Sequence, residues 1–182
     1  MSDTCVFTFM RCNPVHIGHG YVFDRALELQ YELQADLKLF LTATVDDTKN
    51  PLPLDLKKYY INGFFPEIGS VLQNDTKIQL FDVMASLSGS YDNIIFIGGS
   101  DRKDEFKYKL DKYNGVLYNF RNIDTEMAGV DRTICQYSST MMRACAVEKD
   151  YDTFRKALPG DDDSLKYQMF IDVQNRIKHV TK

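Results

Sequence analysis

The sequence lacks the features that mark several broad classes of protein. It has no tryptophan, only 5 prolines and 10 glycines among 182 residues, and no low-complexity tract, so we expect neither a fibrous nor a disordered chain. No apolar run approaches the roughly 20 residues of a membrane-spanning helix, and we therefore expect no membrane partner. The N-terminal residues lack a charged start followed by an apolar core, so we expect no secretory signal.

The chain also lacks an excess of positive charge. Lysine and arginine total 22 against 26 aspartate and glutamate residues, a formal net charge of −4, so we expect no broad nucleic-acid-binding surface. A pocket for a small anion is compatible with this balance, because net charge does not describe a single cleft. None of the four cysteines forms a CxxC pair. Reduced thiols in the cytoplasm are the simplest interpretation for Cys5, Cys12, Cys135 and Cys145.

What is present is an alternation of short apolar runs with amphipathic segments. Residues 5–10 and 93–98 are continuous apolar runs, typical of strands buried on both faces of a parallel sheet. Apolar residues at helical spacing between positions 19 and 35 predict an amphipathic helix. The expected strands are 5–10, 37–43, 93–98, 116–120 and 133–136, and the expected helices are 19–35, 54–64, 76–87, 103–113, 141–147, 150–158 and 164–178.

This order predicts an α/β fold: a Rossmann-like, doubly wound parallel sheet of about five strands with C-terminal helices. We expect a single domain over residues 1–182, in which residues 1–147 form the α/β core and the helices of residues 148–182 pack on it. Ligands bind such open sheets beyond the carboxyl ends of the strands. The segments expected to meet there are the loop at 11–20, the turn at 98–101 and the hydroxyl-rich stretch at 138–140.

The most informative segment is the loop after the first strand. His16 and His19 stand three residues apart at a strand-to-helix junction, with Gly18 between them to permit close approach of the backbone. Free N–H groups and the dipole at a helix N-terminus attract anions. A phosphate there would meet two imidazoles and Arg11, a set suited to charge that develops on a phosphoryl group. The alternative is structural, with one histidine capping the helix and the other filling a surface gap.

A zinc site is a competing interpretation of the same loop. Cys12, His16 and His19 are three potential ligands within eight residues. A structural zinc site needs four ligands, and no fourth candidate has a suitable spacing, because Cys135 and His179 are remote in the sequence. We therefore favour an anion site without a metal held by the protein.

A second polar cluster lies near the end of the expected core. Ser138, Ser139 and Thr140 stand where a helix should begin, so their hydroxyls can cap that helix or bind phosphate oxygens. Arg143 follows one turn later and can add a bidentate phosphate contact. Helix capping alone explains the three hydroxyls equally well. In combination with the histidine loop, the cluster predicts a second wall of one anion site.

These two segments resemble the signature motifs of the HxGH nucleotidylyltransferase superfamily. The first reads Asn13-Pro-Val-His-Ile-Gly-His19 and the second reads Tyr137-Ser-Ser-Thr-Met-Met-Arg143. The resemblance covers about residues 4–147 and includes the strand–helix pattern between the motifs. Asn50-Pro-Leu52 and Gly98-Gly-Ser-Asp101-Arg102 are also similar to segments of small phage-encoded members and of archaeal-type nicotinamide mononucleotide adenylyltransferases.

The resemblance implies transfer of a nucleoside monophosphate from ATP or CTP to a small phosphorylated acceptor, with release of pyrophosphate. It implies that His16, His19 and Arg143 are catalytic, that Asn13 lines the nucleotide pocket and that Asp101 contacts the ribose. Mg²⁺ would arrive with the nucleoside triphosphate and have few protein ligands. The implied nucleotide- and phosphate-binding residues are Arg11, Asn13, Gly18, Asp101, Ser138, Ser139 and Thr140.

The Asn-Pro segment favours one reaction within this family, adenylyl transfer to nicotinamide mononucleotide. Cytidylyl transfer to a phospho-alcohol or a sugar phosphate is the alternative. The expected partners are a nucleoside triphosphate and a small phosphorylated acceptor, without nucleic acid or membrane. The expected location is the cytoplasm, or the host cytoplasm if the chain is phage-encoded, and a homo-oligomer stays open.

Three positions depart from the family pattern. Met10 stands where related loops usually carry glycine, Cys12 replaces an aromatic or other residue, and Tyr137 replaces the common isoleucine. A methionine at position 10 could crowd the phosphates, which motivates a second hypothesis: a nucleotide-binding or phage assembly protein that retains the fold without the reaction. A fragment of an aminoacyl-tRNA synthetase is a third hypothesis, because His16-Ile-Gly-His19 spells the loop of that family, but no KMSKS-like segment is present.

Overall fold

The computed structural model describes residues 2–74, 76–77, 79–99, 103–130 and 134–178. Contacts within the chain divide it into two compact units. The sheet unit comprises Met1–Met10, Tyr21–Thr42 and Val71–Val130, and the helical unit comprises Arg11–Gly20, Ala43–Ser70 and Asp131–Lys182. The chain therefore leaves the sheet unit directly after its first strand and enters the helical unit with the loop that carries both histidines.

The sheet unit contains four parallel strands in the spatial order β2-β1-β3-β4. They are β1 (Thr4–Met10), β2 (Asp36–Leu41), β3 (Asn93–Gly98) and β4 (Asn122–Met127). Phe7 of β1 pairs with Lys38 of β2 on one side and with Phe96 of β3 on the other. Because the strands are parallel, β1 and β3 end at the same edge of the sheet, the edge at which open α/β sheets bind ligands.

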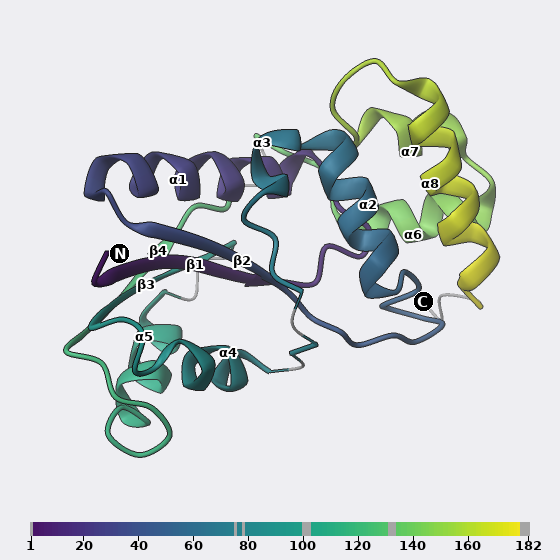
Figure 1. Ribbon diagram of the computed structural model, residues 1–182. Coiled ribbons are helices and arrows are strands. Elements are labelled where there is room, and N and C mark those ends of the chain that lie inside the picture. Colours follow the sequence, from purple (N-terminus) through teal and green to yellow (C-terminus); the bar gives the residue numbers. More distant parts are fainter. Residues whose placement is uncertain (1, 75, 78, 100–102, 131–133, 179–182) are drawn as a thin grey trace. The chain divides into compact units, whose positions relative to one another are not determined.

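Helices cover both faces of this sheet, with α1 on one face and α4 and α5 on the other (Figure 1). Their bounds are α1 (Ile17–Leu33), α4 (Leu80–Leu87) and α5 (Lys103–Lys112). Met84 of α4 and Leu110 of α5 belong to one hydrophobic cluster with Phe7 of β1. On the other face, α1 buries four residues at helical spacing, Val22, Phe23, Ala26 and Leu29. The prediction of an α/β fold with a parallel sheet covered on both faces is confirmed.

The predicted number of strands is wrong for the part of the chain that the structure describes, because four strands pair there rather than about five. Residues 116 and 117 form a turn and Tyr118 makes only an isolated bridge with Asn114, while Tyr118 and Phe120 are buried in the hydrophobic cluster. Gly115 precedes them with φ of 80°, a left-handed conformation that ends regular structure. Residues 134–136 are not in a strand either, and Thr133 lies outside the described residues.

Strand β4 was absent from the sequence-based expectation. Within the described sheet it pairs only with β3, and its buried residues, Ile123 and Thr125, alternate with the exposed Asn122 and Asp124. A strand with one wet face has this alternation rather than a continuous apolar run. The search for apolar runs found the central strands and missed this one.

The helix predictions are confirmed within a few residues, with α1, for example, beginning at Ile17 rather than His19 and ending at Leu33. One boundary differs by more, and one short helix was not predicted. Helix α4 begins at Leu80 rather than Thr76. The short α3 (Pro66–Gly69) was not predicted, since its four residues are fewer than two helical turns.

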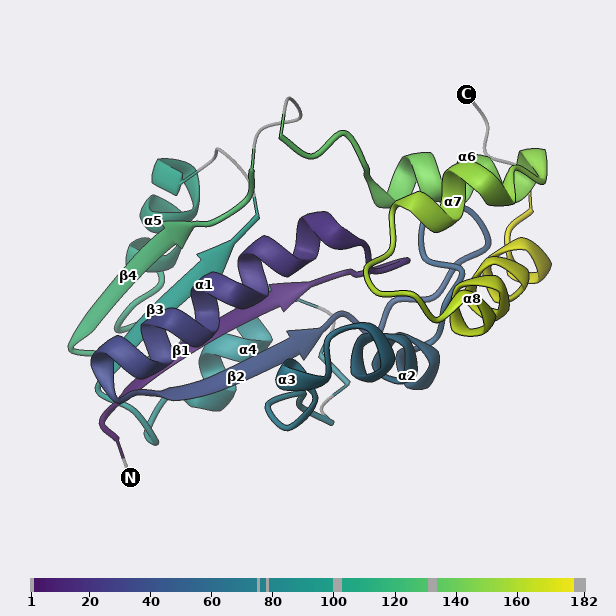
Figure 2. The same ribbon diagram turned by 90° about the horizontal axis from the view of Figure 1, so that it is seen from above.

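The helical unit is built from α2 (Leu54–Phe64), α3, α6 (Ser139–Glu148), α7 (Tyr151–Lys156) and α8 (Asp163–Arg176). Helices α6, α7 and α8 contact one another, and α2 contacts α8 (Figure 2). Phe154 and Phe170 meet edge to face with ring centroids 5.3 Å apart. The N-caps of α6, α7 and α8 are Ser138, Asp150 and Asp162. In the described part of the chain, no helix is long and apolar enough to cross a membrane.

Candidate anion-binding site

The rings of both histidines accept backbone N–H groups at the start of α1. The backbone N–H of Gly18 donates to Nδ1 of His16 at 3.0 Å, and the backbone N–H of His16 donates to Nδ1 of His19 at 3.1 Å. The ring centroids lie 4.0 Å apart. This arrangement resembles a capping box, except that the N-cap side chain accepts the N–H of the second helical residue, Gly18, rather than that of the third. The spacing of the two histidines therefore has a structural cause.

The expectation that the N–H groups at this helix start are free is wrong for the first three of them. The N–H of Ile17 donates to the carbonyl oxygen of Ala157 at 2.9 Å, that of Gly18 to His16 Nδ1, and that of His19 to the carbonyl oxygen of His16 at 2.8 Å. The first three donors are thus engaged within the helical unit. Any hydrogen bonds to an anion must come from side chains and from other elements.

Burial controls the charge of both imidazoles. It lowers the pKa of His16 to about 4, and it lowers the pKa of His19 well below its ordinary value, with the neighbouring His16 adding to that effect. Both rings are therefore neutral near neutral pH. Each Nδ1 accepts a hydrogen bond, so the remaining proton of each ring is on Nε2.

The structure gives no support to a zinc site in this loop. Burial raises the pKa of the Cys12 thiol to about 12, so the thiolate that zinc prefers is disfavoured. The Nδ1 atoms of His16 and His19 already accept backbone protons. Among the described residues, no three His, Cys, Asp or Glu side chains come together as a metal site.

The second predicted motif lies against the first. Ser139 Oγ donates to the carbonyl oxygen of Pro14 at 2.8 Å, and Arg143 Nη1 donates to the carbonyl oxygen of Asn13 at 2.7 Å. Ser138 caps α6 by accepting the N–H of Met141 at 3.1 Å. The hydroxyls of the two serines thus have structural partners. Of the three predicted hydroxyl residues, the exposed Thr140 is left with the most open environment.

Arg143 is a buried cation without a carboxylate partner in the described part of the chain. The residue as a whole is only 8% exposed, and its Nη2 donates to Thr140 Oγ1 at 3.1 Å. Its Nε has no hydrogen-bond partner among the described residues. Burial lowers its pKa from the ordinary value, and the charge of Arg11 lowers it further, while Asp46 opposes both. An anion would satisfy this guanidinium better than the chain itself does.

Asn13 has a different position from the one expected. Its side chain is 1% exposed and is bonded at both ends to Leu52, with Nδ2 donating to the carbonyl oxygen and Oδ1 accepting the N–H, each at 2.9 Å. These bonds tie the histidine loop to the segment before α2. Asn13 therefore positions the loop, and its amide is already engaged on both sides.

Lys57 of α2 is a further buried cation with Arg11 and Asp46 as electrostatic neighbours, and the sequence analysis missed it. It is 1% exposed, and burial lowers its pKa to about 8, with Cys12, Arg11 and Asp46 as its charged or titratable neighbours. The signal lay in its spacing, because position 57 shares the buried face of α2 with Tyr60 and Ile61. A lysine on an apolar stripe is an unusual placement that helical periodicity reveals.

Asp46 is the carboxylate nearest these cations in electrostatic terms, and it is strongly engaged. Its Oδ1 accepts the N–H groups of Thr48, Lys49 and Asn50, and its Oδ2 accepts the side-chain amide of Asn50. These bonds hold the pKa of Asp46 well below its usual range. Arg11 is exposed, whereas Lys57 and Arg143 are buried. We call these three cations and Asp46 the cation cluster. It combines three positive charges with one carboxylate.

The predicted ribose contact, Asp101, lies outside the described residues.

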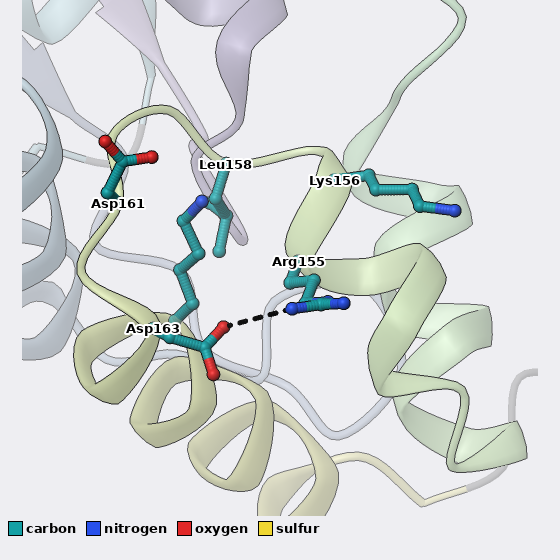
Figure 3. Close-up of a pocket in the computed structure, with 6 residues that line it drawn as sticks. Arg155, Lys156, Leu158, Asp161 and Asp163 are labelled. Carbon is teal, nitrogen blue, oxygen red and sulfur yellow. Dashed lines mark ion pairs between the residues drawn. The ribbon is translucent and has the colours of Figure 1, made fainter.

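A separate pocket of about 540 Å³ lies between α7 and α8 (Figure 3). Its Arg155 pairs with Asp163 at 3.7 Å and its Lys166 donates to the carbonyl oxygen of Gly160 at 2.6 Å. None of the predicted site residues lines it, so the cation cluster is the stronger candidate.

Comparison of the sequence with protein-family models and with curated proteins finds no match. The assignment of a function therefore depends on the residues and their geometry.

Proposed function

We propose that the chain is a nucleotidylyltransferase that moves a nucleoside monophosphate from a Mg²⁺-bound nucleoside triphosphate to a small phosphorylated acceptor. Adenylyl transfer from ATP to nicotinamide mononucleotide is the favoured reaction, through the likeness of the Asn50-Pro-Leu52 segment. Cytidylyl transfer from CTP to a phospho-alcohol or a sugar phosphate is the alternative.

One observation carries the proposal: the two motifs that suggested it are hydrogen-bonded to each other. The bonds from Ser139 to Pro14 and from Arg143 to Asn13 join segments that lie 125 and 130 positions apart. Two motifs that only capped their own helices would have no reason to hydrogen-bond to each other. Their meeting brings the histidine pair and a buried guanidinium into one unit of the chain.

The proposed chemistry needs alignment and charge stabilisation rather than a covalent intermediate. An oxygen of the acceptor phosphate bonds to the α-phosphorus while the bond to the bridging oxygen breaks, and pyrophosphate leaves with the electron pair. The Nε2–H groups of His16 and His19 would donate to the phosphoryl oxygens. The cation cluster would offset the charge of the phosphates. Mg²⁺ enters as part of the substrate, held by phosphate oxygens.

The test is a substrate panel read by pyrophosphate release. ATP, CTP, GTP and UTP are each paired with nicotinamide mononucleotide, phosphopantetheine, phosphocholine, glycerol phosphate and sugar phosphates. We expect release with one nucleotide and one acceptor, and ATP with nicotinamide mononucleotide is the favoured pair. The absence of release from every pair would remove the enzymatic proposal.

Variants that preserve the helix cap sharpen this test. Glutamine at the third helical position can accept the same N–H as histidine, and asparagine is a strong N-cap. His19→Gln and His16→Asn should therefore fold like the parent while turnover falls by roughly 100-fold, the typical value of a transition-state donor. Unchanged turnover in both variants would refute the assignment of the histidines.

A second function, nucleotide binding without transfer, is favoured by one observation. The hydroxyls of Ser138 and Ser139, which the family resemblance assigns to phosphate, are engaged in structural bonds. Because a ligand that binds only the folded state raises the melting temperature, nucleotide binding without catalysis has a clear signature. Stabilisation by a nucleoside triphosphate without pyrophosphate release from any acceptor would favour this function.

A further inference from the structure

A second cavity, of about 610 Å³, lies in the helical unit between the loop before α2 and the C-terminal end of α8. Pockets that take small ligands fall between about 300 and 1,000 Å³, so this cavity has the size for one. His16, His19 and Arg143 are not among its described lining residues. The lining includes Val45, Asp47, Pro51 and Pro53 from the loop and Asn175 and Arg176 from the helix.

Hydrogen bonds hold the two walls of this cavity together. The backbone N–H of Lys178 donates to the carbonyl oxygen of Asp47 at 2.8 Å. Tyr60, which is fully buried in α2, donates its hydroxyl to Oδ2 of Asp172 in α8. Oδ1 of the same Asp172 accepts from Nη1 of Arg176 at 2.6 Å. The walls and the guanidinium of Arg176 are therefore in place before a ligand arrives, which lowers the entropic cost of binding.

The guanidinium of Arg176 has donors available for a ligand. Among the described residues only its Nη1 has partners, the side chain and the carbonyl oxygen of Asp172. Its Nε and Nη2 form the other edge of the planar fork, and such an edge matches two oxygens of a phosphate. The ion pair of Lys178 Nζ with Asp47 is long, at 3.9 Å, and exposed, so this ammonium can serve as a second cation for the same phosphate.

The rest of the lining includes a flat apolar wall. Pro51, Pro53 and Val45 present ring and methyl C–H groups and have no side-chain hydrogen-bond donor. Val45 is 56% exposed, so a ligand that covers it removes apolar surface from water. Such a wall favours a planar ring over a flexible polar chain. The exposed amide of Asn175 can offer one donor and one acceptor to the edge of that ring.

We propose that this cavity binds a mononucleotide, a ligand in which a ribose joins a planar ring to one phosphate. The phosphate pairs with the free edge of Arg176, the ring packs on the two prolines, and the carboxylate of Asp47 accepts the ribose hydroxyls. The inference goes beyond the proposed function, because it adds a ligand site outside the histidine loop.

The cavity shares one residue with the cation cluster. Asp46 lines the cavity, and its charge also acts on Lys57 and Arg143. A phosphate held beside Asp46 should therefore repel a second anion at the cluster. We expect the Kd of tripolyphosphate, a probe of the cluster, to rise roughly fivefold when AMP is saturating, and AMP to be weakened by the same factor. An unchanged Kd would refute this coupling.

Nuclear magnetic resonance with AMP as the probe tests the site without an enzymatic assay. We expect saturable shifts of the backbone amides of Val45, Asp47 and Arg176. Adenosine lacks the phosphate and ribose 5-phosphate lacks the ring, so each should bind roughly tenfold more weakly than AMP, or less tightly still. The absence of saturable shifts at these residues would overturn the proposal, and so would equal affinity for AMP and for either half of it.

Arg176→Gln removes the phosphate contact, and Arg155→Gln is its matched control. Both arginines pair with an aspartate of their own helix, and their side chains are 39% and 46% exposed. We expect the Kd of AMP to rise roughly tenfold or more in Arg176→Gln, as the loss of a hydrogen bond to a charged group implies, and to stay unchanged in Arg155→Gln. Equal affinities of the two variants would exclude Arg176 from a phosphate site.

Val45→Ser tests the apolar wall at an exposed position where the fold does not depend on the side chain. Its Kd for AMP should rise roughly threefold, while its Kd for ribose 5-phosphate stays that of the parent. Val116→Ser, at an exposed position of the sheet unit, is the control and should bind AMP like the parent. An AMP affinity that is the same in both variants would contradict the packing of a ring on this wall.

Pyrophosphate release then separates two sources of the mononucleotide and the fate of the proposed function. A raised KM for the acceptor in Arg176→Gln identifies the bound mononucleotide as the acceptor, whereas an unchanged KM together with lost inhibition by AMP identifies a separate effector. AMP binding that Arg176→Gln weakens, with no pyrophosphate release from any pair of substrates, retains the cavity site and rejects the transferase. Transfer by a protein whose AMP binding is insensitive to Arg176→Gln retains the transferase and rejects the cavity site.

Discussion

Arg143 donates a hydrogen bond of 2.7 Å from Nη1 to the backbone carbonyl oxygen of Asn13, 130 positions earlier in the chain. A neutral carbonyl oxygen compensates a buried guanidinium only in part, because it carries no full charge. The same Asn13 uses its side chain to hold Leu52, so one residue links the histidine loop both to α6 and to the segment before α2. This junction explains why a polar loop has a fixed shape. It also leaves a buried cation whose Nε has no hydrogen-bond partner among the described residues.

The first prediction concerns Arg143→Lys. Lysine keeps the charge but cannot donate to Asn13 and Thr140 at once from a planar fork. We expect the free energy of unfolding to fall by about 2 kcal/mol, the typical size of a hydrogen bond to a charged group. Urea denaturation measures this change. The control is Arg121→Lys, because the side chain of Arg121 is 74% exposed in a surface ion pair and should change stability by less than about 0.5 kcal/mol. Equal effects of the two substitutions would contradict the junction.

The second prediction concerns Asn13→Ala. The variant leaves the N–H and the carbonyl oxygen of the buried Leu52 without partners, and we expect a loss of about 2 to 4 kcal/mol in the free energy of unfolding. Asn13→Asp replaces the donor to the carbonyl oxygen of Leu52 by a carboxylate oxygen that repels it in a buried position, so its loss should be at least as large. The exposed Asn175 serves as the control, since Asn175→Ala should stay within about 0.5 kcal/mol of the parent. Chemical denaturation of the four proteins decides the order.

The sign of the pH dependence follows from the buried histidines. Burial lowers the pKa of His16 from its ordinary 6.5 to about 4, so the unfolded chain binds more protons than the folded chain between these values. Stability is therefore complete above about pH 6.5 and is lost progressively as the pH falls toward about 4, by roughly 3 kcal/mol for this residue. His19 contributes with the same sign.

His16→Asn isolates this contribution, because asparagine caps the helix and does not titrate. We expect the difference in unfolding free energy between the parent and His16→Asn to shift in favour of the variant as the pH falls below about 6. Thermal or urea unfolding at a series of pH values measures it. A difference that stays constant with pH would show that His16 titrates normally in the folded protein.

The central strands could be predicted from the sequence because a strand buried on both faces needs apolar residues throughout. Residues 93–98 are apolar on both sides, as a central parallel strand requires, and the prediction agrees with β3. Strand β4 carries Asp124 and Glu126 among its six residues, so its pattern describes an edge rather than a core. The apolar Tyr118 and Phe120 belong to the core without belonging to a strand. Hydrophobicity alone does not distinguish these cases.

The site was predictable in its residues and less so in their roles. The motifs containing His16 and Arg143 were found from spacing and chemistry, and the structure brings their segments together. The alternative was that one histidine caps the helix and the other fills a surface gap, and in the structure the rings of both histidines accept backbone N–H groups through Nδ1. The burial of Lys57 was accessible from its helical spacing with Tyr60 and Ile61, whereas its electrostatic coupling to Arg11 and Asp46 depends on tertiary packing that no local pattern determines.

Lys57 gives the last prediction, a loss of anion affinity in mild alkali. Its pKa is lowered to about 8 by burial, so its charge disappears at a pH where an ordinary lysine is still protonated. ATP is fully ionised in this range, so a change in its affinity reports on the protein. We expect the Kd of ATP to rise with pH above about 8, by up to roughly tenfold per pH unit, because binding then requires uptake of a proton. Isothermal titration calorimetry of the parent and of Lys57→Arg measures both curves. The arginine variant should bind with little pH dependence, and parallel curves for the two proteins would exclude Lys57 from the anion site.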